Sequence, residues 1–196
     1  MQFFLKRNNM SDRFSQRKKD VLSKIDKSSI GEWDAKIAPL CKKINLKPNY
    51  YTTSSCSGRV ILMVDQDKKG KGLFLFVSHD KISFNQLKKE LDLALKKGKN
   101  IKFKEEPCIL HISCKTLEDA EILYEKGKLA GWKRLGIIGT RNGFTFELNS
   151  TEKLEFPIIQ NGKILVDDIF LKIITEDSNN KLEKNWMKIK KLEKII

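Results

Sequence analysis

The chain has 196 residues, 40% of them hydrophobic, and carries 39 Lys and Arg against 25 Asp and Glu, a formal net charge of +14. This length suffices for one good core or two small ones, and the apolar content excludes a disordered chain. The basic excess favours a polyanionic partner, nucleic acid first, over a small acidic metabolite acting alone. A general lysine enrichment, with the lysines spread along the sequence, is the alternative explanation of the same charge.

The cysteines and the apolar segments indicate a cellular compartment. Cys41, Cys56, Cys108 and Cys114 form no Cys-x-x-Cys pair, which disfavours a zinc ribbon or a thioredoxin-like site. Residues 1–11 contain too short an apolar run for a secretory signal, and no stretch has the apolar length of a membrane span. The sequence therefore predicts a reduced, cytoplasmic protein without membrane contact, with a loose extension over its first 11 residues.

Two helices are predicted before residue 48. The first follows the extension and places apolar residues on one face and Arg17 and Lys18 on the other. This basic face is either a solvated surface or one that faces phosphates. A linker over 26–34 leads to a second helix over 33–45, in which Pro39 either introduces a kink or marks the true start.

Residues 50–64 hold the most unusual pattern in the sequence. Six small hydroxyl or thiol residues, 52–57, are followed by Gly58, Arg59 and an apolar run over 60–64 that predicts a buried strand. Small residues leave backbone N–H and hydroxyl donors accessible, and the guanidinium adds a fork of donors, so the stretch suits an anionic or polar ligand. A Ser/Thr-rich loop with a turn at the glycine is the alternative.

A hairpin partner, a helix and a strand come next. The strand over 73–79 pairs with the preceding strand and places His79 at its end. A helix capped by Ser83 is predicted to continue to about residue 97, and a short strand follows over 101–105.

The strand predicted over 108–114 decides whether its histidine belongs to a metal site. Side chains alternate along a strand, so Cys108 and Cys114 share one face while His111 points to the other. The thiols and the imidazole therefore cannot ligate one ion, and no metal site is predicted.

The last third of the chain repeats an earlier order of elements. The expected elements are a helix over 116–131 capped by Thr116, strands over 136–141, 144–149, 154–159 and 163–166, and a long C-terminal helix capped by Asp167. A turn at Asn161-Gly162 is predicted between the last two strands. Because helix–strand–strand occurs twice, we expect an internal duplication with pseudo-repeats over about 33–105 and 106–196, within one domain over 12–196. The predicted fold is α+β with a mixed β-sheet core. It is non-Rossmann, because no Gly-x-Gly-x-x-Gly follows a strand.

Several residues from these elements form a recognisable set. They are Phe14, Arg17 and Lys18, Asp26, Ser28, Gly31, Trp33 and Asp34, the run Tyr51–Arg59, Val77 to His79, Glu106 to His111, Ala120, Gly131, Trp132 and Gly136, and Asn179, Asn180 and Asn185. On this set the chain resembles the methyltransferase family of the third step of wybutosine synthesis, from Phe14 onward. Leu135 and Lys188 depart from the serine and arginine usual there, and a lysine weakens any bidentate phosphate contact.

The resemblance implies transfer of a methyl group from S-adenosylmethionine to a ring nitrogen of 4-demethylwyosine, beside the anticodon of tRNA(Phe). It implies cofactor contacts by Ser55, Ser57, Gly58 and Arg59, the arginine pairing with a carboxylate such as that of the methionine moiety. Cys56 is expected to be a packing thiol, because transfer from a sulfonium requires no covalent enzyme intermediate.

A proton acceptor and a surface for the tRNA complete the predicted site. His79 and His111 are the predicted general bases, and Glu106 either acts as a base or holds His111. Histidines bonded to backbone carbonyls, with a structural role only, are the alternative. Tyr51 and Trp132 are predicted to stack on the base, although Trp132 fits a core position equally well.

Arg17 and Lys18 are the predicted contacts to the tRNA backbone, and we expect a monomer. A non-catalytic tRNA-binding module with a basic surface is the main alternative function, and a small-molecule-binding regulatory domain is a third. The non-catalytic module would bind tRNA equally well with and without S-adenosylmethionine.

Overall fold

The computed structural model describes residues 13–23, 34–66, 70, 72–141 and 143–196. The expected extension over 1–11 and most of the predicted linker over 26–34 lie outside these residues. Among the helices that are described, none is both long enough and apolar enough to cross a membrane.

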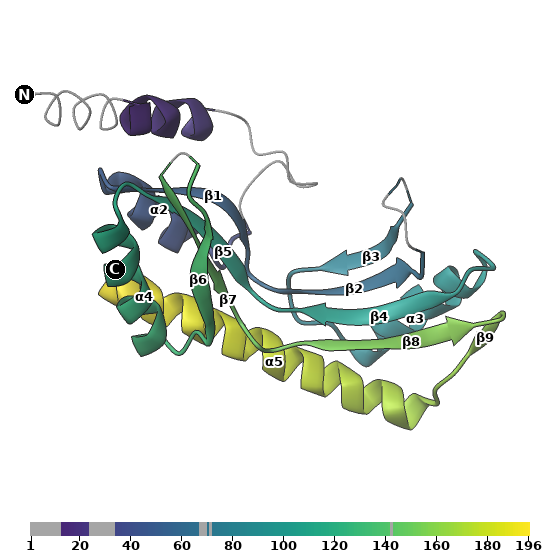
Figure 1. The fold of residues 1–196 in the computed structure, drawn as a ribbon. Helices are drawn as coiled ribbons and strands as arrows, with labels where there is room; N and C mark the ends of the chain where they lie inside the picture. The colour runs from purple at the N-terminus through teal and green to yellow at the C-terminus, as the bar shows by residue number, and fades with distance from the viewer. Residues whose placement is uncertain (1–12, 24–33, 67–69, 71, 142) are drawn as a thin grey trace, which may run out of the picture. The chain divides into compact units, whose positions relative to one another are not determined.

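Helices and strands alternate in an order close to the predicted one (Figure 1). A helix over 13–22 precedes α2 (Ala38–Leu46), β1 (Tyr50–Cys56), β2 (Arg59–Val64), β3 (Phe74–Ser78), α3 (Phe84–Leu95), β4 (Ile101–Glu106), β5 (Ile109–Cys114), α4 (Leu117–Leu129), β6 (Arg134–Gly139), β7 (Phe144–Asn149), β8 (Leu154–Gln160), β9 (Lys163–Ile164) and α5 (Asp168–Ile195). The strands form two sheets, in the orders β1-β5-β7-β6 and β3-β2-β4-β8-β9. All pairings between these strands are antiparallel, which confirms the α+β class and fits a non-Rossmann fold.

The chain divides into two compact units. Unit 1 comprises Met1–Cys56, Ile109–Thr151 and Met187–Ile196, and unit 2 comprises Ser57–Cys108 and Glu152–Trp186. The four-stranded sheet belongs to unit 1 and the five-stranded sheet to unit 2. The units interleave along the chain and so do not follow the two expected halves, and the internal duplication stays a prediction.

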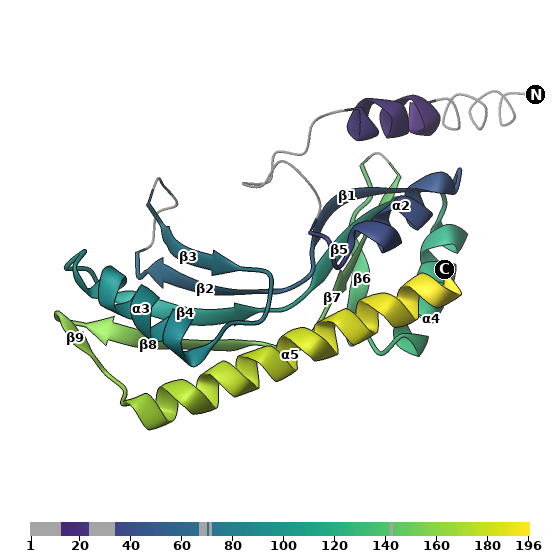
Figure 2. The ribbon, with the colours of Figure 1, turned by 180° about the vertical axis from the view of Figure 1, so that it is seen from behind.

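Unit 2 is built on one face of its sheet. Buried residues of β2, β4 and β8 pack in one cluster with Leu87 and Leu91 of α3 and with Leu171, Ile174 and Leu182 of α5. Because these helices share that cluster, α3 and the part of α5 in unit 2 cover the same sheet face (Figure 2). The predicted cap of α3 is confirmed, since the Ser83 side chain accepts a hydrogen bond from the Gln86 backbone N–H.

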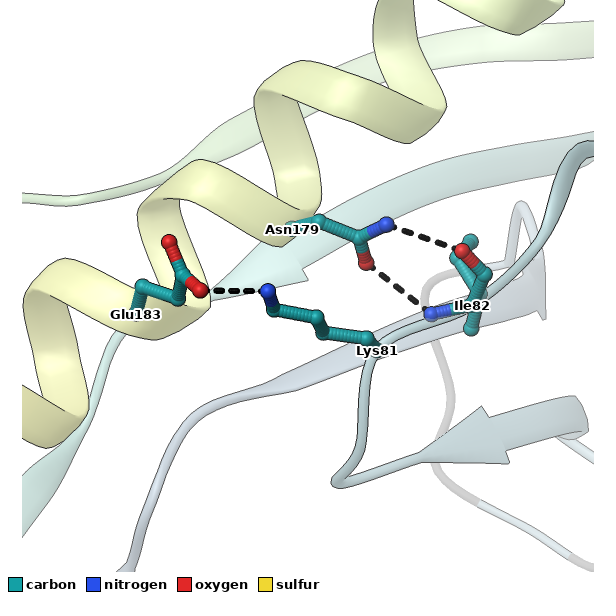
Figure 3. Close-up of polar contacts among 4 residues, drawn as sticks. All are labelled: Lys81, Ile82, Asn179 and Glu183. Atoms are coloured by element: carbon teal, nitrogen blue, oxygen red, sulfur yellow. Dashed lines mark hydrogen bonds and ion pairs between the residues drawn. The ribbon is translucent and has the colours of Figure 1, made fainter.

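Asn179 fastens α5 to the segment between β3 and α3 (Figure 3). Its Oδ1 accepts from the backbone N–H of Ile82 at 2.9 Å, and its Nδ2 donates to the carbonyl of the same residue at 2.8 Å. One turn later on α5, Glu183 pairs with Lys81. The amide thus satisfies both backbone groups of a buried residue in a segment without a sheet partner, which explains an asparagine in mid-helix.

Unit 1 has the alternation that the sequence predicted for β5. Leu110, Ile112 and Cys114 are fully buried, while His111 on the other face is half-buried. A capping box opens α4, in which the Thr116 hydroxyl accepts from the Asp119 N–H and the carboxylate of Asp119 accepts from the Thr116 N–H. The predicted cap at Thr116 is confirmed, and the structure adds the return hydrogen bond from the Thr116 N–H to the Asp119 carboxylate.

Two local predictions were resolved by the structure. The small-residue run is not a loop: Tyr50–Cys56 is strand β1, paired with β5, with an irregularity in register between Thr52 and Ser54. Pro39 marks the true start of α2, where its missing N–H costs no helical hydrogen bond. The four cysteines are free thiols, and all except the half-buried Cys56 are buried.

Candidate functional site

Arg59 lies at the start of β2, opposite Glu106 at the end of β4. Its Nε donates to the Glu106 carboxylate at 2.7 Å, and its guanidinium carbon lies 5.2 Å from the centroid of the Phe74 ring. Both charged side chains are about one quarter to one third exposed, with values of 26% and 34%. The contact uses only Nε, so the two terminal nitrogens remain able to bind a carboxylate or phosphate from solution.

Gly58 precedes this arginine in a backbone conformation with φ of +97°. A Cβ at this position would lie 2.9 Å from the Asn185 Nδ2, 3.3 Å from the Glu106 carbonyl oxygen and 3.4 Å from a Leu182 methyl carbon. The position therefore requires glycine twice over, for its backbone angle and for the closeness of α5 and β4. The turn that aims Arg59 is held against these two elements.

Glu105 and Asn185 form a buried polar pair beneath this turn. Glu105 is 1% exposed and Asn185 is fully buried, and the amide Nδ2 donates to the carboxyl Oε1 at 3.2 Å. Neither the other carboxyl oxygen nor the amide Oδ1 has a hydrogen-bond partner among the described residues. Burial raises the pKa of Glu105 to about 9, with Lys181 opposing the shift and Glu152, Asp177 and Glu106 adding to it. The carboxyl group is therefore a neutral acid at neutral pH.

His111 in unit 1 has a carboxylate partner. It stands opposite Glu147 in the pairing of β5 with β7, and its Nε2 lies 2.8 Å from a carboxylate oxygen of that residue. A carboxylate only accepts hydrogen bonds, so Nε2 carries the proton in the neutral ring and Nδ1 offers a lone pair. The prediction that Glu106 holds His111 is wrong: Glu147 is the partner of the imidazole, and Glu106 pairs with Arg59.

The other predicted ligand contacts differ in accessibility. Ser55, on β1, is half-buried, while Ser57 and Gly58 are buried and shape the turn rather than offer surface to a ligand. His79, directly after β3 in unit 2, is half-buried. Ser55 and His79, together with Arg59 described above, therefore have exposed surface that a ligand can reach.

Two predicted base-stacking residues are core residues. Tyr51 is 1% exposed and packs on Phe14, with the ring centroids 5.2 Å apart, and Trp132 is 2% exposed. A ring with no accessible face cannot stack on a nucleobase, so the structure contradicts the prediction that these two residues stack on the base. Of the predicted phosphate contacts, Arg17 is exposed, whereas the Lys18 ammonium donates to the backbone carbonyl of Lys47, and burial lowers the Lys18 pKa.

Comparison with known proteins identifies the family. The family model described as Methyltransferase TYW3 matches residues 16–196. This chain belongs to the TYW3 methyltransferase family. A curated relative from Danio rerio, named "tRNA wybutosine-synthesizing protein 3 homolog", is 32% identical over 191 residues, which cover 94% of this chain and 75% of that protein. The family membership confirms the expected resemblance, and the chain is an enzyme of the methyltransferase class.

Archaeal relatives of the TYW3 family are similar in sequence and in structure. A Pyrococcus furiosus protein named "tRNA(Phe) 7-((3-amino-3-carboxypropyl)-4-demethylwyosine(37)-N(4))-methyltransferase 1" is 35% identical over 192 residues, covering 95% of this chain and 96% of the relative. The solved structure of PH1069 from Pyrococcus horikoshii has a TM-score of 0.83 and 33% identity, with 94% of both chains covered. A hypothetical protein from Aeropyrum pernix, at 22% identity and a TM-score of 0.69, shares the fold; the match covers 83% of this chain and 96% of that one.

Two acidic residues, one in each unit of this TYW3 chain, were absent from the sequence-based site. Glu147 follows an unremarkable Phe-Thr-Phe and becomes visible only when the β5–β7 register places it opposite His111. Glu105 had a signal: in a strand with a two-residue period, Phe103 and Glu105 share the inward face. Burying a carboxylate costs free energy, so a glutamate on the buried face of a predicted strand indicates a special role at that position.

Glu105→Gln is expected to stabilise this TYW3 chain by about 3 kcal/mol at pH 7 and by about 1 kcal/mol at pH 5. The native acid keeps its proton up to a pKa of about 9, whereas the unfolded chain releases it near its ordinary value. The unfolded state thus binds fewer protons between these two values, and wild-type stability falls as pH rises through that window. The neutral glutamine removes the dependence.

Urea unfolding of both proteins from pH 5 to pH 8.5 measures this difference. The stability gap between variant and wild type should widen by up to about 1.4 kcal/mol per pH unit. Parallel stability curves over this range would show that Glu105 is ionised in the native protein.

Proposed function

We propose that this chain transfers the methyl group of S-adenosylmethionine to N4 of a demethylwyosine base at position 37 of tRNA(Phe). The observation that carries the proposal is the TYW3 family match over 16–196, which contains the unusual Tyr51–Arg59 run. The Pyrococcus relatives are named for this reaction on the base that carries a 3-amino-3-carboxypropyl group.

The residues around Arg59 fit a methyl donor with an amino acid end. The Arg59 guanidinium is partly exposed and is oriented by Glu106 through Nε, and it provides terminal donors suited to a carboxylate. The preceding Gly58 lacks the side chain that would push the turn away from α5, so Arg59 is held in place. S-adenosylmethionine supplies an electrophilic methyl group when bound. The task of the protein is then to bind and align, which accounts for much of the rate in a displacement reaction.

A proton leaves the ring nitrogen when the methyl group arrives. The new N–CH₃ bond forms as the sulfur–CH₃ bond breaks, and the N–H proton is released. His111 is the proposed acceptor, because Glu147 fixes its Nε2–H and leaves Nδ1 unprotonated. The carboxylate also stabilises the imidazolium formed by proton uptake.

A methyl-transfer assay tests the proposal. Purified protein, tritiated S-adenosylmethionine and tRNA(Phe) carrying the 7-aminocarboxypropyl-demethylwyosine base should yield labelled tRNA, with the N4-methyl base identified by mass spectrometry of the nucleosides. The control is the same tRNA with guanosine at position 37. Binding of both tRNAs without dependence on S-adenosylmethionine and without transfer would favour the non-catalytic module.

His111→Ala is expected to lower the turnover number about 100-fold or more, because a general base contributes about 10²–10⁴ to the rate. Glu147→Gln should lower it about tenfold with the Michaelis constant for tRNA unchanged, since the carboxylate acts through the imidazole. Steady-state kinetics on the modified tRNA measure both. A wild-type turnover number in His111→Ala would remove this residue from the mechanism.

A further inference from the structure

The positive charge of the chain is concentrated in one of its two units. Unit 1 contains 22 Lys and Arg against 11 Asp and Glu, a net +11, and unit 2 contains 17 against 14, a net +3. A general lysine enrichment would spread the excess over both units, which are of similar size. The distribution instead indicates that unit 1 is the part adapted to a polyanion.

The two units also use their lysines differently. In unit 2, Lys102 pairs with Asp65 at 2.8 Å and Lys104 with Glu155 at 2.9 Å, so carboxylates of the same unit neutralise these ammonium groups. Near the C-terminus of α2 in unit 1, Lys43 donates instead to a backbone carbonyl, that of Glu193, at 2.6 Å. A carbonyl contact leaves the full positive charge in place.

Unit 1 contains a cavity of about 310 Å³ whose lining includes two lysines. It is lined by Lys47, Pro48, Asn49, Tyr50, Asp119, Ile122, Leu123, Lys126 and Ile196. Burial and the neighbouring charges of Lys47 and Lys43 lower the pKa of Lys126. Like charges are thus held close together, and neither Lys47 nor Lys126 forms an ion pair with a carboxylate of the described residues.

The carboxylate of Asp119, which lines the cavity, already accepts hydrogen bonds from other residues of unit 1. Asp119 accepts from the backbone and hydroxyl of Thr116 at 3.1 and 3.0 Å, and from the Asn49 amide at 3.0 Å. Its lone pairs serve the start of α4 and the end of the α2–β1 connection, rather than the two ammonium groups. An anion from outside would relieve the repulsion between the lysines without displacing an internal partner.

We propose that unit 1 binds the phosphodiester backbone of the tRNA through Lys47 and Lys126 at this cavity. The inference rests on the proposed tRNA substrate and adds the contact surface. Each ammonium acts as a point charge that neutralises a phosphate and releases its condensed counterion. The contact positions the RNA and reads no base.

The double variant Lys47→Ala/Lys126→Ala tests the proposal in the full chain. Fluorescence anisotropy with labelled tRNA(Phe) transcript at 50 to 300 mM KCl gives the dissociation constant and its salt dependence. We expect binding about tenfold weaker at 0.1 M salt and a slope of log K against log salt that is smaller by about 1.4 to 1.8. The arginine pair Lys47→Arg/Lys126→Arg should keep the wild-type slope, because both charges remain.

Lys89→Ala/Lys96→Ala is the matched control, since it removes two exposed lysines at α3 of unit 2, where Asp92 lines the same surface. A wild-type slope in the Lys47/Lys126 double alanine variant, an equal loss in the α3 control, or no tRNA binding by the wild type would each overturn the proposal. The readout is binding to a transcript that cannot be methylated. A failure of methyl transfer by the wild type is therefore a separate result, which counts against the proposed function alone.

Discussion

The Arg59→Ala variant is expected to lose methyl transfer by about 100-fold while keeping the native fold. A guanidinium bound to a carboxylate contributes charge-assisted hydrogen bonds of about 1.5–3 kcal/mol each, and the alanine removes them from the proposed donor. The ion pair with Glu106 is partly solvent-exposed, so its loss costs at most about 1 kcal/mol of stability. Methyl transfer under saturating tRNA, with calorimetric titration of S-adenosylmethionine, measures the effect.

Two further variants separate charge from geometry at Arg59. Arg59→Lys keeps the charge but has neither the fork of donors nor the Nε bond to Glu106, so it should recover only part of the activity. Glu106→Gln keeps the arginine and releases its orienting carboxylate, and it should weaken donor binding less than Arg59→Ala does. Wild-type affinity for S-adenosylmethionine in Arg59→Ala would show that the guanidinium serves another ligand.

The Gly58→Ala variant is expected to lose about 3–4 kcal/mol of stability. Gly58 has a φ of +97°, a backbone conformation that residues with a side chain rarely adopt. Holding alanine in this conformation costs about 1 kcal/mol or more. The added Cβ would also overlap the Asn185 Nδ2 at 2.9 Å. Asn185 cannot retreat easily, because it is fully buried and its amide donates to Glu105.

Gly131→Ala is the matched control for this substitution. Gly131 also has a positive φ, +87°, but no atom lies within 4 Å of the position of its Cβ. It should lose only about 1 kcal/mol, the backbone part of the cost. Urea unfolding of the two variants compares them directly. Equal losses would mean that α5 and β4 yield to the extra methyl group and that close packing does not constrain the turn.

Local patterns in the sequence predicted most of the fold. The two-residue period of 108–114 gave the faces of β5 correctly, and Ser83 and Thr116 gave the starts of α3 and α4. The Asn161-Gly162 turn between β8 and β9 is also as predicted, with positive φ values at both residues. The strand that follows Tyr50 was not predicted, because Ser and Thr are common in loops as well as in strands, and pairing with β5 decided the outcome.

The candidate site could be predicted only in part, because its contacts join strands distant in sequence. Arg59 and His111 were found from their residue types, but their partners depend on sheet register, which one sequence does not contain. Tyr51 and Trp132 were predicted as ligand contacts because aromatic residues suit nucleobases, yet the same large rings release the most free energy when buried. The division into two units also escaped prediction, because each unit combines separate segments of the chain.

The buried cysteines can be used to measure local opening of the structure. Cys41 and Cys114 lie in unit 1 and Cys108 in unit 2, each with no exposed surface. Burial raises the pKa of Cys114 to about 12, so its reactive thiolate is scarce until the surrounding structure opens. Alkylation by a maleimide, followed peptide by peptide in mass spectrometry, therefore records how often each unit opens on its own, without any engineered label.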